Sequence, residues 1–115
     1  GSIMKQEAFT MSLLFDTYGA LLTEKQQTYF DLYYNQDLSL AEIAEQEGIS
    51  RQGVHDAISR SEALLASFER VAREQKLRHA LAAITAEAQP LLQAGDPATR
   101  QGAQRILAAV DSLKE

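Results

Sequence analysis

The chain has 115 residues, no cysteine and a formal net charge of −5. This length fits one compact domain, or one small domain with an extension. The lack of cysteine excludes disulfides, thiolate zinc sites, iron–sulfur clusters and a cysteine nucleophile, and the acidic balance argues against a strongly cationic binder of polyanions. The sequence holds no apolar run of membrane-spanning length and opens without a secretory signal, so we expect a cytoplasmic protein.

Charge is unevenly distributed along the chain. Residues 1–50 carry two lysines against eight acidic residues, residues 51–78 carry six basic against four acidic residues, and residues 79–115 carry three against four. The middle segment is therefore the only positive one. The first three residues, 1–3, precede Met4 and are expected to be a remnant of cloning.

The composition and spacing of the first half predict helices. Alanine, leucine, glutamate and glutamine are plentiful, and apolar residues recur at every third or fourth position, which is typical of an all-α fold. We expect a first helix from about Lys5 to about Leu21. Its expected apolar stripe consists of Phe9, Leu13, Leu14, Tyr18 and Leu21.

Two short helices follow, and a capping box marks the start of each. Thr23 with Gln26 forms a capping box before a helix over about 24–35, whose aromatic residues point to more than one face and place it between two neighbours. Ser39 with Glu42 forms a second capping box before a helix over about 40–47. Gly48 suits the left-handed conformation that ends such a helix.

The fourth helix is expected to begin at Arg51, after Ser50 as its N-cap, and no proline follows until Pro90. Its apolar stripe changes side by about 150° between residues 54–72 and residues 77–88. Either the helix breaks near residues 73–76, or one long helix packs on the N-terminal helices first and on something different later. Asp96 and Pro97 then start a last helix, which completes an αα-hairpin.

Residues 39–60 follow a helix-turn-helix pattern. Ala44 is small where two helices cross, Gly48 permits the sharp turn, and apolar residues at 43, 49, 54 and 58 face inward. Glu47 departs from the pattern, because an apolar residue is common there. The residues left for binding form what we call the outward face of the second helix: Ser50, Arg51, Gln52, His55, Ser59 and Arg60.

The outward face has side chains suited to nucleic acid. Glutamine can pair with adenine and arginine with guanine or phosphate, and a helix N-terminus attracts anions. Asp56 lies on the same side and repels phosphates, and the first fifty residues are acidic, which weakens the sequence-independent part of nucleic-acid affinity. A protein-docking or dimerisation module without nucleic-acid binding is therefore the alternative. The sequence contains neither a catalytic motif nor a metal-ligand spacing, so we expect no enzyme activity, no metal and no cofactor.

A family resemblance covers roughly residues 9–69. It is carried by Leu22-Thr23-Glu24-Lys25-Gln26, Tyr33-Tyr34, the run 37–45, Ser50-Arg51-Gln52-Gly53-Val54-His55-Asp56 and Arg60-Ser61-Glu62. These residues are similar to the YlxM family, small bacterial proteins whose helix-turn-helix resembles region 4 of the primary sigma factors. The resemblance implies a cytoplasmic bacterial protein that modulates the signal recognition particle pathway. It also implies that Arg51, Gln52, His55 and Arg60 are contacts, since sigma region 4 uses the corresponding face on promoter DNA.

Together these patterns predict an all-α protein with a helix-turn-helix domain over residues 4–69 and a helical extension over residues 70–115. We expect a non-catalytic regulator that binds DNA, or the RNA or protein of the signal recognition particle. The shifted stripe cannot share the surface used by residues 54–68 if the helix is straight, so the extension is predicted to form a homodimer. The predicted interface residues are Leu77, Leu81, Ile84, Ala88, Ile106, Val110 and Leu113.

Overall fold

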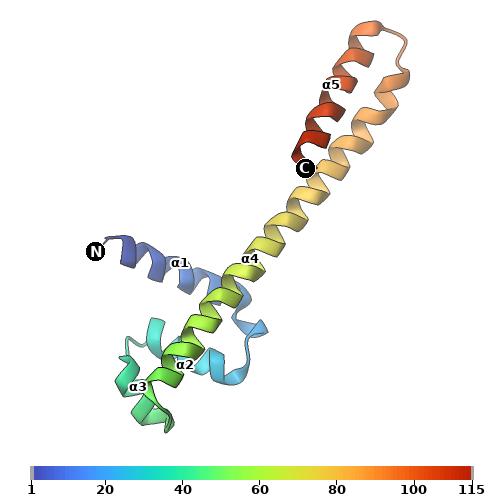
Figure 1. The fold of residues 1–115 in the computed structure, drawn as a ribbon. Helices are drawn as coiled ribbons and strands as arrows, with labels where there is room; N and C mark the ends of the chain where they lie inside the picture. The colour runs from blue at the N-terminus through green and yellow to red at the C-terminus, as the bar shows by residue number, and fades with distance from the viewer. Residues whose placement is uncertain (1, 115) are drawn as a thin grey trace. The chain divides into compact units, whose positions relative to one another are not determined.

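A computed structural model of the chain describes the backbone of residues 2–114 and the side chains of residues 7–114. The expected cloning remnant, residues 1–3, therefore lies outside the residues whose side chains are described. Every regular element in the described part is a helix (Figure 1), which confirms the all-α prediction. The elements are α1 (Ser2–Tyr18), the 3₁₀ helix η1 (Gly19–Leu21), α2 (Glu24–Tyr34), α3 (Leu40–Glu47), α4 (Arg51–Ala88), the 3₁₀ helix η2 (Gln89–Gln93) and α5 (Pro97–Lys114).

Helix α4 is continuous from Arg51 to Ala88, so the break considered near residues 73–76 does not occur. The chain nevertheless divides into two compact units, the first ending at Val71 and the second beginning at Ala72. We describe each unit by itself. None of the helices in the described residues is long and apolar enough to cross a membrane.

The first unit has two apolar clusters that share helix α2. One cluster joins α2 to the helix-turn-helix through Tyr29, Leu32, Ile43, Val54 and Ile58. The other cluster has the buried residues Leu22, Phe30 of α2 and Leu65 of α4, and partly buried side chains of α1 pack against it. Because α2 supplies both clusters from different faces, its predicted position between two neighbours is confirmed.

The predicted stripe of α1 is only partly correct. Leu14 and Tyr18 pack against the second cluster, as expected, together with Met11 and Phe15. Phe9, Leu13 and Leu21 are instead half or more exposed. The reason is the Phe15 ring, which stacks on Phe30 of α2 at a centroid distance of 4.7 Å and so selects the face of α1 that turns inward.

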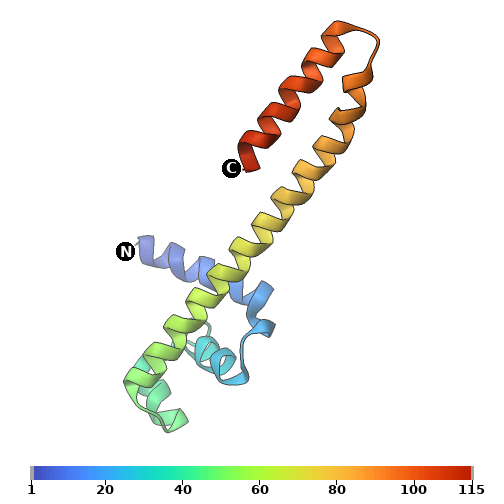
Figure 2. The same ribbon diagram turned by 45° about the vertical axis from the view of Figure 1, so that its right-hand side comes forward.

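The second unit is an antiparallel pair formed by the later part of α4 and by α5, which lie side by side in Figures 1 and 2. Its buried hydrophobic residues are Leu81, Ala88, Ala103 and Val110. The turn is fixed by Arg100, whose Nη1 donates to the carbonyl oxygens of Ala94 at 2.7 Å and Gly95 at 3.0 Å. Asp96 caps α5 as predicted, because its Oδ2 accepts from the Thr99 backbone N–H at 2.9 Å.

Candidate nucleic-acid interface

The helix-turn-helix is built from local signals that the structure reproduces. Both capping boxes are present: Thr23 and Gln26 start α2, and Ser39 and Glu42 start α3. Gly48 ends α3 with φ +69° and ψ 33°, which is the left-handed conformation expected for glycine at a helix end. The three-residue turn 48–50 then leads directly into α4.

Ser50 is the N-cap of α4. Its Oγ accepts a hydrogen bond from the Gly53 backbone N–H at 3.0 Å. Gly53 itself leaves little room for a side chain, since a Cβ placed there would lie 3.1 Å from this oxygen. The cap therefore uses one of the N-terminal donors that an anion would otherwise meet, while Ser50 remains exposed at the helix start.

The inner side of the motif is held by residues that are almost completely buried. Ile43 of α3 and Val54 of α4 have no exposed surface, and Ile58 has 4 %. Ile49, which was also predicted to face inward, is instead 37 % exposed. Ala44 packs beside the three buried residues at the helix crossing. One turn further along α4, Ser61 is also fully buried, and its hydroxyl donates to the Ala57 carbonyl at 2.8 Å.

All six residues of the outward face are exposed. This agrees with the prediction, which assigned the apolar positions to the inner side and left these residues on the outside. Their hydrogen bonds were not predicted. Gln52 Nε2 donates to Asp56 Oδ1 at 2.9 Å, and the same oxygen lies 3.4 Å from His55 Nδ1. The carboxylate of Asp56 thus engages two of the side chains considered for base contacts.

Asp56 is an anionic side chain held by its neighbours. The hydrogen bonds from Gln52 and then His55, with a smaller effect of the Arg60 charge, hold the pKa of the Asp56 carboxyl below its ordinary value. The outward face therefore combines two arginines with an adjacent carboxylate. A phosphate approaching Arg51 meets attraction, whereas one approaching the middle of the face meets a like charge.

A hollow of about 140 Å³ beside the outward face is a feature that sequence reasoning missed. Its lining includes His55 and Ser59 from that face and Tyr33, Tyr34 and Glu62 behind it. The Tyr34 hydroxyl donates to a carboxylate oxygen of Glu62. Burial, together with this hydrogen bond, raises the pKa of Tyr34 well above its ordinary value.

The sequence did contain a signal for this hollow. Glu62 follows Ser59 by three residues and therefore lies one helical turn further along the same side of α4. The pair Tyr33-Tyr34 was used only as part of a family resemblance. The contact between Tyr34 and Glu62 spans 28 residues of sequence and is fixed by the tertiary fold.

The described residues contain no group of three or more histidine, cysteine, aspartate or glutamate side chains that could hold a metal ion. The side chains of the outward face itself are hydrogen-bonding and charged groups. It offers donors from arginine and glutamine, hydroxyls from two serines, and one fixed carboxylate.

Comparison with known proteins gives a consistent picture. The family model UPF0122, described as "Putative helix-turn-helix protein, YlxM / p13 like", matches residues 5–93. A UPF0122 protein of Symbiobacterium thermophilum is 45% identical over 104 residues, which cover 87% of this chain and 91% of that protein. These matches confirm the resemblance to the YlxM family, and the family model extends it through the rest of α4 to the end of η2.

Other relatives match over a shorter stretch. A UPF0122 protein of Clostridium kluyveri is 58% identical over 64 residues, 56% of this chain and 58% of that protein. A UPF0122 protein of Bacillus thuringiensis is 52% identical over 66 residues, 57% of this chain and 60% of that protein. The chain thus matches little more than half the length of these two relatives.

Proposed function

We propose that this chain, which belongs to the UPF0122 family of YlxM / p13-like helix-turn-helix proteins, is a non-catalytic cytoplasmic regulator that binds nucleic acid through the outward face. One observation carries the proposal. The start of α4 is packed on one side only, where its Val54 and Ile58 meet Ile43 of α3, while all six candidate contact residues are exposed. In helix-turn-helix proteins, the recognition helix packs against the domain on one side, and its exposed side enters a groove of the duplex.

Arg51 has the most favourable position for a phosphate. It is the first residue of α4, where the helix dipole and the backbone N–H groups favour an anion. No acidic residue occurs in the first turn of α4, whereas α2 and α3 have Glu24 and Glu42 in theirs. This difference leaves the start of α4 as the electropositive helix end of the motif.

Gln52 and His55 stand further along the same side, where base edges would lie. Because both are engaged by Asp56, a base contact must replace the hydrogen bond from Gln52 to Asp56 with one of at least equal strength. The expected result is weak binding to arbitrary sequences. A cognate site would offer the glutamine a matched partner such as adenine.

The target is proposed to be duplex DNA or the RNA of the signal recognition particle, in line with the family resemblance. The rival proposal is a protein-docking face without nucleic-acid binding. It is favoured by the charge of Asp56 and by the net charge of −6 on residues 1–50. We also propose that two copies act together through residues 70–115.

A salt titration of binding distinguishes these proposals. Fluorescence anisotropy with a labelled DNA duplex and with labelled particle RNA would be measured for the whole chain. Arg51→Ala is expected to weaken binding to all sequences and to lower the slope of log affinity against log salt by about one. Asp56→Asn is expected to strengthen binding, since it removes a like charge facing the phosphates.

Arg70→Ala is the matched control, because Arg70 is an exposed arginine of the same helix outside the outward face. It should leave both affinity and slope unchanged. The nucleic-acid proposal fails if Arg51→Ala and Asp56→Asn behave like Arg70→Ala on both probes. The protein-docking proposal is supported if the same two variants then abolish binding to the protein of the signal recognition particle.

A further inference from the structure

The hairpin formed by residues 72–114 leaves large apolar side chains exposed in a regular pattern. Its exposed large hydrophobic residues, which we call the hairpin stripe, are Leu77, Ile84, Leu91, Ile106 and Leu113. Leu77 and Ile84 on α4 are seven residues apart, as are Ile106 and Leu113 on α5, and Leu91 follows Ile84 by seven residues in η2. Seven residues are nearly two full helical turns, so the members on each helix form a line along its axis.

The stripe occupies one side of the hairpin. Ile84 follows the buried Leu81 of α4 by three positions, and Leu91 of η2 follows Ala88, the buried last residue of α4, by three positions. Ile106 and Leu113 follow buried residues of α5 by three positions in the same way. Three positions along a helix rotate a side chain by about 300°, which is about 60° short of a full turn. Because the two helices are antiparallel, an equal rotation from their shared buried side places both lines on the same side.

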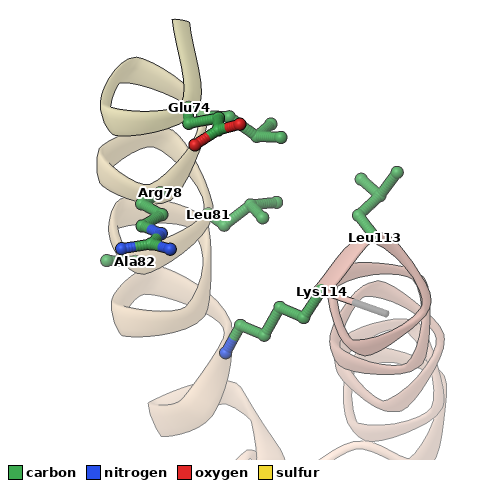
Figure 3. Close-up of a pocket in the computed structure, with 7 residues that line it drawn as sticks. Glu74, Arg78, Leu81, Ala82, Leu113 and Lys114 are labelled. Atoms are coloured by element: carbon green, nitrogen blue, oxygen red, sulfur yellow. The ribbon is translucent and has the colours of Figure 1, made fainter. Parts of the chain in front are cut away.

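The two lines also face each other across a groove. Leu77 of α4 and Leu113 of α5 both line this groove of about 440 Å³, and Figure 3 shows Leu113 opposite the stretch of α4 from Glu74 to Ala82. Seven residues later on α4 stands Ile84, and seven residues earlier on α5 stands Ile106. Because the two helices are antiparallel, Ile84 and Ile106 each lie about 10 Å nearer the turn than Leu77 and Leu113.

The residues predicted for the dimer interface fall into two groups that differ in their exposed fraction. Leu81, Ala88 and Val110 have at most 5 % exposed surface and are used inside the hairpin itself. Leu77, Ile84, Ile106 and Leu113 are between 43 % and 62 % exposed. Leu91, which was not predicted, is 43 % exposed and belongs with them.

We infer that a second copy of this chain covers the hairpin stripe, so that two hairpins form a four-helix bundle in which α4 of each copy packs on α5 of the other. This inference rests on the homodimer of the proposed function and names its surface and its orientation. The two-fold axis runs along the helices. In this arrangement Ile84 packs near Ile106 of the second copy, and Leu77 packs near Leu113 of the second copy, because a two-fold axis along the helices leaves every residue at its own height.

The area of the stripe fits such an interface. Five side chains about half exposed, at roughly 180 Å² each, present about 450 Å² of apolar surface, which is the size of the largest patch on an ordinary monomer. Two copies would bury roughly 900 Å² from these residues alone, near the lower limit of about 1,000 Å² for a specific interface. Ala80 and Ala109 are exposed beside the stripe and would add to the buried area.

Charge complementarity selects the orientation. Glu87 and Arg105 lie beyond the stripe, each on the outer edge of its own helix, so they are on opposite edges of one hairpin. Turning a second hairpin by 180° about the helix direction brings Arg105 of that copy to the edge that holds Glu87. The two residues are then offset by only about 3 Å along the axis, which side chains of this length can span.

The mass of the full chain in solution tests the surface. Sedimentation at concentrations up to about 100 µM should give twice the chain mass of 12.7 kDa for the natural sequence. Ile84→Glu should give the single-chain mass with unchanged helical circular dichroism. Leu21→Glu is the control, because Leu21 is 67 % exposed and lies outside the stripe, and it should remain dimeric. A natural chain that is monomeric throughout, or an Ile84→Glu variant that stays dimeric, would overturn the inference.

A charge exchange tests the orientation. Glu87→Arg or Arg105→Glu alone should weaken dimerisation about 3- to 30-fold, because the two-fold axis repeats each like-charge contact. Both exchanges together should restore the affinity of the natural chain. Weakening without restoration would refute the packing of α4 on α5 of the second copy.

The same samples separate this inference from nucleic-acid binding. Natural chain that is dimeric but binds neither probe would contradict the nucleic-acid proposal and support the bundle. A chain that binds a probe but stays monomeric would support the nucleic-acid proposal and contradict the four-helix bundle. Neither result depends on the other, because Ile84 and the outward face are more than twenty residues apart in sequence.

Discussion

Phe30 is the largest fully buried side chain among the described residues. Its side chain has no exposed surface and is stacked between two other rings, with centroid distances of 4.7 Å to Phe15 and 4.4 Å to Tyr34. Phe30→Ala is expected to cost about 3–5 kcal/mol of unfolding free energy. The two ring contacts, at about 0.5–1.5 kcal/mol each, account for part of this cost.

The loss is large compared with the total stability of a small domain, which is about 5–15 kcal/mol. At about 4–8 °C per kcal/mol for a domain of this size, the melting temperature should fall by at least about 12 °C. Urea unfolding, monitored by tyrosine fluorescence, would measure the loss of unfolding free energy. This signal reports the first unit alone, because all four tyrosines lie in it and the chain has no tryptophan.

Phe9→Ala is the matched control, since Phe9 is the same residue type at 67 % exposure on α1. It should change stability by no more than about 0.5 kcal/mol. Equal losses for the two variants would refute the assignment of the inward face of α1. A loss below about 1 kcal/mol for Phe30→Ala would refute the role of the stacked rings.

Three further predictions concern the turn, the buried tyrosine and a helix cap. Gly48→Ala should cost about 1–2 kcal/mol in thermal unfolding because of its positive φ, whereas Gly95→Ala, at a position with open space and no positive φ, should be nearly neutral. The raised pKa of Tyr34 means that the folded chain keeps this proton above pH 10, where an unfolded tyrosine loses it; stability is then full below about pH 10 and falls above it, and Tyr34→Phe should make that fall shallower in urea midpoints taken at each pH. Asp96→Ala should cost about 1 kcal/mol and lower the helical signal at 222 nm near the transition, since it removes the cap of α5; an unchanged signal would contradict the capping role.

Local features of the fold could be predicted from the sequence. Thr23 with Gln26 and Ser39 with Glu42 define helix starts within four residues, and Gly48 defines a helix end by its own backbone freedom. Tertiary choices could not be predicted in the same way. Phe9 and Leu13 fit the helical period of α1 as well as Phe15 does, and only the contact between Phe15 and Phe30 decides which face is buried.

The candidate site shows the same division. The outward positions follow from helical geometry once Val54 and Ile58 are assigned to the inside, and all six are exposed. The engagement of Gln52 by Asp56 depends on the rotamers of both side chains, which periodicity does not specify. The bond between Tyr34 and Glu62 requires α2 and α4 to be packed already.

The capping boxes have a consequence for how the first unit folds. Starting a helix is the costly step in its formation, because several residues must be fixed before hydrogen bonds repay the loss of entropy. In α2 and α3 the first turn is held by two reciprocal side-chain bonds contributed by residues only three apart. Such helices can begin within microseconds and without help from distant parts of the chain. Helices this short are still completed by tertiary packing, and for α2 that packing includes the contact of Phe30 with the cluster that contains Leu65 of α4.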